Sequence, residues 1–492
     1  MGVVRKQSAW NSFYSYLGAL LGFLNKLFLL IIFFSQDQVG LLNILLTISL
    51  VFAQFSDMGF VQVTLRFFPY FNDRNAGHHG FLAWSLIFSF AGFAILSALV
   101  FLFEPQIIEY YGKNSPLLAH YFKYVLILGF ANLIFNVFEV YLRTLLKTVV
   151  PNMIREFFLR FLNTLGFAVY ALNWVNFEDF VMLYIGINSS IAIIVVAYTA
   201  FLKQLHLRPR LSFFRIKTAD NLWTYAAVSL LLTSVGQFAI NLDAIMMGNI
   251  LDEKKVGIYT IVVFLVSFTM IPARAMYRIA NTLVANHWKS GNMKEMDNLY
   301  KKVSHISIII GSFFFLIVYL NFKDFFTIVR AEYVAGLGAF FILGMARLFD
   351  MACGLNGIIL STSKAYWLDI PFSIGLLLLA IFNNRWLMPI YGLEGAALAN
   401  LITFVFYNIL RLSAVAWIYK LQPFQWKSLA VILIASASGL VAWILPSLGN
   451  PVADIAFRSI LFLALFAFPI LKFRLSPEIQ EFLGKWLKRL IS

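Results

Sequence analysis

The sequence predicts an all-α integral membrane protein of about fourteen transmembrane helices. Three observations support this fold class: an extreme composition, a series of long apolar segments and an internal repeat. Of the 492 residues, 61% are hydrophobic and 12% are charged, whereas soluble domains hold about 45–50% apolar and about 25% charged residues. A water-soluble surface cannot be built from this composition, so the apolar surplus must face a lipid bilayer.

A helix needs about 20 mostly apolar residues to cross about 30 Å of hydrocarbon. Fourteen segments meet this condition, and the first is too long and lacks the cleavage pattern for a signal peptide. The predicted spans are residues 10–34, 40–65, 80–103, 118–142, 152–172, 180–202, 221–250, 256–279, 303–322, 334–360, 366–382, 392–418, 428–446 and 453–472.

The distribution of basic residues predicts the orientation of these spans, because Lys and Arg resist translocation. If the N-terminus is cytoplasmic, 28 of the 38 Lys and Arg residues fall on the inner side. Six fall in outer loops: Lys113, Lys254, Lys255, Lys323, Arg330 and Arg385. We therefore expect both termini to be cytoplasmic.

A basic stretch from Lys203 to Lys217 separates the first six spans from the others, and its Pro209 would interrupt a helix. It is either a hinge between two bundles or an ordinary cytoplasmic loop. Residues 476–492 predict an amphipathic helix on the anionic inner leaflet. The predicted domains are therefore an N-terminal six-helix bundle, a linker, a C-terminal six-helix bundle, two extra spans and this interfacial helix, at residues 1–202, 203–220, 221–420, 421–475 and 476–492.

An internal repeat relates the two bundles. SQDQVGLLN at residues 35–43 resembles LDEKKVGIY at residues 251–259, and the alignment superimposes Gly40 on Gly257. Six spans separate the copies, so both halves enter the membrane in the same sense, related by a pseudo-two-fold axis along the membrane normal. Transporters of this plan bind substrate between their halves. A chance match of two short loops is the alternative.

The same alignment brings Lys26 onto Asp243, two charged residues inside predicted spans. A charge at mid-bilayer costs roughly 2.5–3.5 kcal/mol on insertion scales, so we expect both residues, and Arg347, to face a hydrated cavity or a partner. Other intramembrane charges occur at helical spacing, where they can neutralise each other. These couples are Glu139 with Arg143 and Glu156 with Arg160, and Arg347 and Asp350 share the tenth span.

Basic residues at the inner mouths of the spans suit a phosphorylated substrate, because phosphate is best held by Arg forks and Lys point charges. The positive-inside rule explains Arg66, Arg274 and Arg278 equally well. The candidate substrate-binding residues are Lys26, Arg143, Arg274, Arg278 and Arg347. The candidate coupling or gating residues are Asp243, Glu139 and Asp350.

Other kinds of chemistry are not indicated. The single Cys353 excludes an intramolecular disulfide, the six His residues lack metal-ligand spacing, and there is no P-loop motif. We therefore expect no cofactor and no metal, while H+ or Na+ remains open as a coupling ion. The net charge of +15 is dispersed between apolar segments, so nucleic acid is not an expected partner.

Three segments resemble signatures of O-antigen and capsule-type polysaccharide flippases. Residues 356–400 resemble the stretch after the tenth span of these proteins, especially Leu-x-Pro-x-Tyr-Gly-x-x-Gly-Ala-Ala at residues 387–397. Residues 241–262 are similar to their seventh-span signature, and residues 55–68 to the close of their second span. The resemblance implies the fold of multidrug, oligosaccharidyl-lipid and polysaccharide exporters, with two six-helix bundles around a central cavity.

The resemblance also implies a function: flipping a glycan linked to undecaprenyl pyrophosphate across a bacterial inner membrane by alternating access, for lipopolysaccharide or capsule synthesis. The implied partners are the lipid-linked glycan, membrane lipids and, as an open question, a glycan polymerase. The alternatives are an ion-coupled drug exporter and a flippase for the peptidoglycan lipid precursor. A membrane glycan polymerase or ligase is disfavoured because the longest predicted outer loop, residues 104–117, is short for a catalytic site.

Overall fold

A computed structural model describes residues 2–215, 222–477 and 480–481 of the chain. The described residues are almost entirely helical and include no strand. Ten of the described helices are long and apolar enough to cross a membrane, and the bent pair α13 and α14 makes an eleventh. The described part of each of the fourteen predicted segments is chiefly helical, and the predicted all-α membrane fold is confirmed.

Contacts divide the chain into two compact units, Met1–Thr260 and Ile261–Ser492. The predicted division into bundles, linker and extra spans stays a prediction. Residues 216–220 of the linker and most of the C-terminal amphipathic helix lie outside the described residues.

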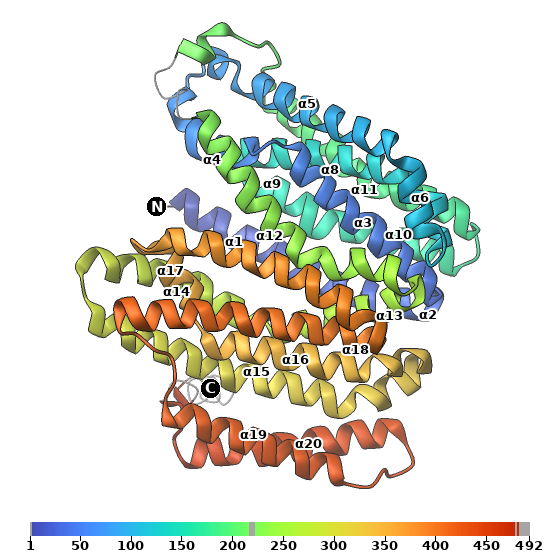
Figure 1. Cartoon of the computed structure of the whole chain (residues 1–492), viewed down its shortest axis with the longest axis vertical. Helices are drawn as coiled ribbons and strands as arrows, with labels where there is room; N and C mark the ends of the chain where they lie inside the picture. The colour runs from blue at the N-terminus through green and yellow to red at the C-terminus, as the bar shows by residue number, and fades with distance from the viewer. Residues whose placement is uncertain (1, 216–221, 478–479, 482–492) are drawn as a thin grey trace. The chain divides into compact units, whose positions relative to one another are not determined.

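The first unit contains the helices up to the start of α13 (Figure 1). In chain order they are α1 (Gly2–Leu24), η1 (Asn25–Leu29), α2 (Leu30–Phe33), α3 (Gln36–Ser56), α4 (Phe60–Phe71), η2 (Gly77–Gly80), α5 (Phe81–Leu102), α6 (Glu104–Gly112), α7 (Pro116–Tyr121), α8 (Tyr124–Thr144), α9 (Val149–Asn152), η3 (Met153–Phe158), α10 (Leu159–Ala171), α11 (Phe177–Phe201), η4 (Leu211–Arg215), α12 (Leu222–Ile250) and α13 (Glu253–Thr269).

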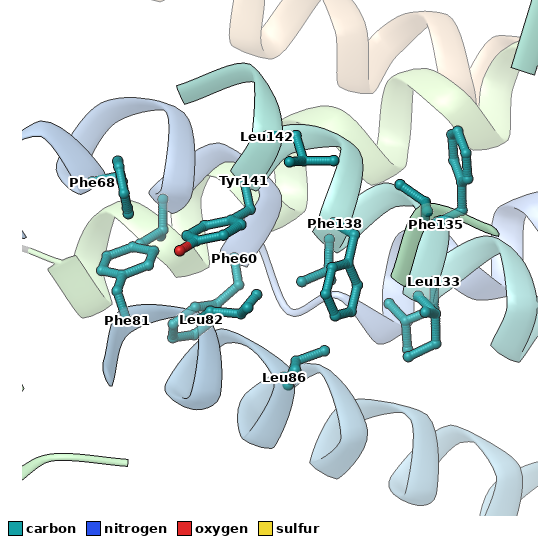
Figure 2. Packing of buried hydrophobic residues seen from close by; sticks show 14 of the residues in the cluster. Phe60, Phe68, Phe81, Leu82, Leu86, Leu133, Phe135, Phe138, Tyr141 and Leu142 are labelled. Atoms are coloured by element: carbon teal, nitrogen blue, oxygen red, sulfur yellow. The ribbon is translucent and has the colours of Figure 1, made fainter. Parts of the chain in front are cut away.

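The core of this unit is built largely from aromatic side chains of α4, α5 and α8. Tyr141 packs edge to face against Phe68, with ring centroids 5.4 Å apart, and Phe68 packs in the same way against Phe81 at 5.5 Å. Figure 2 shows these rings together, with Phe138 further along α8. Such pairs add about 0.5–1.5 kcal/mol beyond the area they bury, so they hold the three helices firmly together.

The two repeat-related glycines meet in a symmetric contact inside the first unit. A Cβ at Gly40 would overlap the carbonyl oxygen of Glu253, and a Cβ at Gly257 would overlap the carbonyl oxygen of Gln36. The repeat alignment also pairs Gln36 with Glu253. Each helix start therefore presents the equivalent glycine and the equivalent carbonyl group to the other. This reciprocity supports a real internal repeat, because a chance match would not place equivalent atoms in equivalent contacts.

A second close approach joins α1 to η3. A Cβ at Gly18 would overlap the carbonyl oxygen of Glu156. One turn later, a Cβ at Gly22 would lie 3.4 Å from Nη1 of Arg160. Small residues four apart let helix backbones approach closely. A π-helical segment lies on each side of this contact: η1 follows α1, and η3 precedes α10. Such wide turns occur frequently at functional sites.

The second unit contains the rest of α13 and the helices α14 (Ile271–Ser290), α15 (Met293–Val329), η6 (Ala331–Gly336), α16 (Leu337–Cys353), α17 (Asn356–Thr362), η7 (Tyr366–Leu368), α18 (Asp369–Tyr419), α19 (Trp426–Ile444) and α20 (Pro451–Lys472). The long α18 comprises two predicted spans joined at Gly392, whose φ of 59° and ψ of −126° suit only glycine. α19 and α20 lie side by side (Figure 1), and Arg458 of α20 pairs with Asp324 of α15 at 2.9 Å.

Candidate functional site

The first polar network of the N-terminal unit surrounds Lys26 on the π-helical segment η1. The neighbouring Asn25 donates a hydrogen bond to the carbonyl oxygen of Arg160 at 2.9 Å and accepts one from Thr164 at 2.8 Å. Arg160 forms an ion pair with Glu156 at 2.8 Å. The charge of Arg160 also acts on Lys26. The pair of Arg160 and Glu156 therefore lies at this junction of η1 and α10.

The second network of this unit centres on the carboxylate of Glu139 in α8. Its Oε1 accepts from Arg143 at 2.7 Å, and its Oε2 accepts from Arg155 at 3.0 Å. Arg155 also donates to Asn136 at 3.1 Å, and its guanidinium lies over the ring of Phe135. One carboxylate cannot neutralise two guanidinium groups, so this network keeps a net positive charge.

The π-helical segment η3 joins the two networks. Its consecutive residues Arg155 and Glu156 point to different partners, Arg155 to α8 and Glu156 to α10. Three guanidinium groups and two carboxylates therefore meet along one short helical stretch. They belong to Arg143, Arg155 and Arg160 and to Glu139 and Glu156.

Asp243 lies in α12, where only 8% of its surface is exposed. Its Oδ2 accepts a hydrogen bond of 2.9 Å from the hydroxyl of Tyr259 in α13. The repeat alignment pairs Asp243 with Lys26. The predicted role of Asp243 in coupling or gating stays a prediction.

In the second unit, a polar column links α16, α17 and α18. Asn408 donates to Asp350 at 2.9 Å and accepts from Asn356 at 3.0 Å. One turn along α16 from Asp350, the guanidinium of the half-buried Arg347 lies 4.3 Å from the centroid of the Phe404 ring. Cation–π contact of this kind stabilises a desolvated guanidinium while leaving its N–H donors able to bind an anion.

The same column ends in a bidentate ion pair. Arg411 donates two hydrogen bonds to Asp369, at 2.8 and 2.7 Å, and its guanidinium lies 4.1 Å from the centroid of the Tyr407 ring. The two charged side chains are only 20% and 22% exposed. The planar fork of arginine matches a carboxylate closely, so this pair fixes the start of α18 against its second half.

Arg274 and Arg278 lie on α14, and both are exposed. Arg274 is close enough to Arg347 for their like charges to interact. Arg274 and Arg347, on different helices of one unit, therefore lie within electrostatic range of each other. Two guanidinium groups that repel each other favour an anion beside them.

Some of the charged groups in these networks were not among the predicted site residues. Arg155 was missed because its partner Glu139 is not a helical neighbour. Arg411 could have been found from sequence, because it ends a polar face in an otherwise apolar span. Asn400, Thr403, Tyr407 and Arg411 follow a spacing of three or four, and Asn408 stands next to Tyr407.

The arrangement suits binding and passage of an anion within apolar helices. Guanidinium forks and amides supply donors, and the carboxylates hold these cations in place. Within the described ranges, no three His, Cys, Asp or Glu side chains gather in a way that could hold a metal ion.

Fold and site together define a multi-pass, all-helical membrane protein with cationic groups held inside its spans. No family model matches the chain, and no curated protein sequence matches it. Among solved structures it is similar to the lipid II flippase MurJ in an inward closed conformation, with 12% identity and a TM-score of 0.71 over 94% of this chain and 98% of that one.

It is also similar to an inward-facing multidrug resistance MATE family transporter of the MOP superfamily. That match has 12% identity and a TM-score of 0.59, over 78% of this chain and 91% of the other. The chain therefore shares the fold of these two solved structures, and the fold implied by the sequence resemblance is confirmed.

Proposed function

We propose that the protein is a flippase, not an enzyme, that moves an undecaprenyl-pyrophosphate-linked oligosaccharide from the inner to the outer leaflet by alternating access, for cell-surface polysaccharide synthesis. The observation that supports this most directly is the cationic surplus of the polar networks. In the first unit three arginines accompany two carboxylates, and in the second Arg274, Arg347 and Arg411 accompany Asp350 and Asp369.

The physical problem of such a transporter lies in the head group of its substrate. A pyrophosphate and several sugars are too strongly hydrated to cross hydrocarbon, whereas a polyprenyl tail stays in it. Cationic groups already held within the membrane replace the lost hydration of the phosphates. Their N–H donors are fixed by neighbouring carboxylates and rings, so little ordering is needed when an anion arrives.

Two further lines of support concern the lipid-linked cargo. A lipid II flippase shares the fold over nearly the whole chain. The polysaccharide branch is favoured by the motif at residues 387–397 and by the segments at residues 241–262 and 55–68.

The proposed roles are those suggested by the sequence. Lys26 and Arg347 contact the head group, and Arg143, Arg274 and Arg278 attract it at the cytoplasmic side. Asp243, Glu139 and Asp350 act as carriers of a coupling ion, H+ or Na+, or as locks on the cationic groups. We place the protein in a bacterial inner membrane with both termini in the cytoplasm, where a glycan polymerase is a further candidate partner.

The proposal is tested with the full chain in proteoliposomes that contain a lipid-linked oligosaccharide. We expect the glycan to become accessible to an impermeant lectin or glycosidase on the opposite leaflet. Parallel vesicles carry the lipid-linked peptidoglycan precursor or a cationic dye. Movement of the dye alone would support a drug exporter, a function favoured by the similarity to the MATE transporter. Movement of the peptidoglycan precursor alone would support a flippase for that lipid precursor.

Charge reversal identifies the residues that act on the head group. We expect Lys26→Glu and Arg347→Glu to abolish flipping while the protein still inserts, and Lys26→Arg to retain it. Lys254→Glu and Arg385→Glu are matched controls, because both side chains are exposed in predicted outer regions. In cells, Lys26→Glu should cause inner-leaflet lipid-linked glycan to accumulate. Normal export by a well-expressed Lys26→Glu protein would refute this role of Lys26.

A further inference from the structure

A strained turn of the first unit lies outside the networks described above. Four consecutive residues, Gly77 to Gly80, have positive φ values of 55°, 52°, 54° and 72°. His78 and His79 are the two non-glycine residues among them, and such backbone is costly for a side chain with a Cβ. Strain of this kind persists only where the surroundings impose it, and it clusters at ligand-binding sites.

The surroundings are supplied by residues 203–215, which follow α11. A Cβ at Gly80 would come within 2.7 Å of the carbonyl oxygen of Arg208 and the amide nitrogen of Arg210. The indole of Trp84 donates to the carbonyl oxygen of Arg210 at 3.1 Å. Phe213 is buried and stacks on Phe71, with ring centroids 4.9 Å apart. The segment is therefore fixed against the turn.

The hydroxyl of Tyr141, beside Phe68 and Phe81 in Figure 2, extends this anchoring. It donates to the carbonyl oxygen of Gln204 at 3.1 Å. The side chain of Gln204 lies 3.1 Å from Nε2 of His78. If the amide oxygen of Gln204 accepts this bond, Nε2 of His78 carries the proton.

Two imidazole nitrogens in this contact have no hydrogen-bond partner among the described residues. They are Nδ1 of His78, whose side chain is 2% exposed, and Nε2 of the half-buried His206. The two rings lie 5.4 Å apart. A buried polar atom without a partner is costly, and each one in a folded protein calls for an explanation. A ligand that accepts a hydrogen bond from an N–H of these rings would provide one.

Two arginines complete a cationic group around these rings. The guanidinium of Arg210 lies 3.6 Å from the Cβ position of Gly77, as does Nδ1 of His206. Burial, and then the charges of His78, Arg210 and Arg74, lower the pKa of His206. The nearby Asp73 uses its Oδ1 to accept from the backbone N–H groups of Asn75 and Ala76.

Exposed apolar side chains border the cationic group. Leu207, Leu211 and Phe214 on the same segment are 53%, 73% and 43% exposed. A cationic cluster flanked by exposed apolar side chains is typical of a surface that sits at the head groups of a bilayer. The sequence predicts that both the turn and residues 203–215 lie on the cytoplasmic side.

We propose that Arg74, His78, His206 and Arg210, here named the turn site, bind a phosphate group. The phosphate belongs to an anionic lipid head group of the inner leaflet or to free phosphate, and the apolar border favours the lipid. Only two imidazoles face each other here, and no third His, Cys, Asp or Glu joins them in the described chain. A metal ion is therefore the weaker occupant.

The test uses the purified full chain in nanodiscs, without any transport assay, so its outcome is independent of the proposed flippase activity. Thermal stability and binding are measured in phosphatidylcholine alone, with added phosphatidylglycerol, and with inorganic phosphate. We expect the wild type to be stabilised by one of the two phosphates. Arg210→Gln combined with His206→Gln should weaken binding at least about tenfold, the loss expected for one charge-assisted hydrogen bond.

Two further variants keep the test decisive. Arg74→Gln removes an exposed cation without touching the strained turn, so it should fold normally and still weaken binding. Arg385→Gln is the matched control and should bind like the wild type. A lipid response that Arg74→Gln weakens assigns the turn site to a head group, and a response to inorganic phosphate alone assigns it to the free ion. Equal responses of the wild type and Arg74→Gln, or no response at all, would overturn the proposal.

Discussion

Replacing either of the repeat-related glycines should destabilise the protein by the same mechanism and to a similar extent. At Gly40 an added Cβ meets the carbonyl oxygen of Glu253, and at Gly257 it meets that of Gln36. In both cases the obstacle is helix backbone, which cannot rotate away as a side chain can. Gly40→Ala and Gly257→Ala must therefore push the starts of α3 and α13 apart.

The expected magnitude follows from the cost of overpacking, typically about 1–3 kcal/mol per substitution in a well-packed interior. Since Ala in a helix is otherwise favoured over Gly by roughly 0.5–1 kcal/mol, we expect a net loss of stability of about 0–2.5 kcal/mol for each single variant. Separating the two helix starts makes room for both added methyl groups, so one displacement relieves both clashes. The double variant should therefore lose less than the sum of the single losses.

The assay is thermal unfolding of the purified chain in detergent, followed by tryptophan fluorescence. Gly186→Ala is the control, because nothing lies within 4 Å of its Cβ position in α11. This change should be neutral or slightly stabilising. A large loss for one glycine and none for the other would refute the symmetric contact, as would strictly additive losses in the double variant.

Other predictions concern the ion pair of α18 and the turn site. Asp369→Leu should lower the free energy of unfolding by about 3 kcal/mol, because it leaves the largely buried guanidinium of Arg411 unpaired. Adding Arg411→Met should restore most of this stability, and thermal unfolding of the wild type, the single variant and the double variant checks it. Docking of residues 203–215 should depend on pH, because the pKa of His206 is lowered from its ordinary 6.5. The undocked state then binds more protons, so docking is strongest above about pH 6.5 and weakens as the pH falls below it. Hydrogen exchange of this segment, in phosphate-free buffer, measures the effect, and faster exchange at higher pH beyond the intrinsic trend would contradict it.

The placement of the helices could be predicted from sequence because apolar length is a local property. Helical spacing also predicted the local ion pairs, and Glu139 does contact Arg143, as Glu156 contacts Arg160. The repeat could be detected because Gly40 and Gly257 tolerate no side chain where the two helix starts meet. In each case the signal lies within a few residues or in a direct comparison of two segments.

Other features depend on contacts distant in sequence and were not predicted. The second arginine on Glu139, Arg155, comes from another helix. Tyr259 as the partner of Asp243 and Asn408 as the partner of Asp350 are also tertiary contacts. The π-helical segments have no apparent composition signal, since their sequences NKLFL and MIREFF read like ordinary helix. Apolar periodicity reports which face is buried, but it does not report a local widening of the backbone.

The π-helical segments η1 and η3 allow charged side chains to be reoriented while the ends of their helices stay in place. A π turn holds one residue more than an α turn, and successive residues of an α-helix are about 100° apart around the axis. If the wide turn migrates along η1, each residue that it passes swings through about that angle. Lys26 could thus change the direction in which it points while Gly18 stays seated against Glu156. The wide turn would move along the helix one residue at a time, and the span as a whole would not need to slide or tilt.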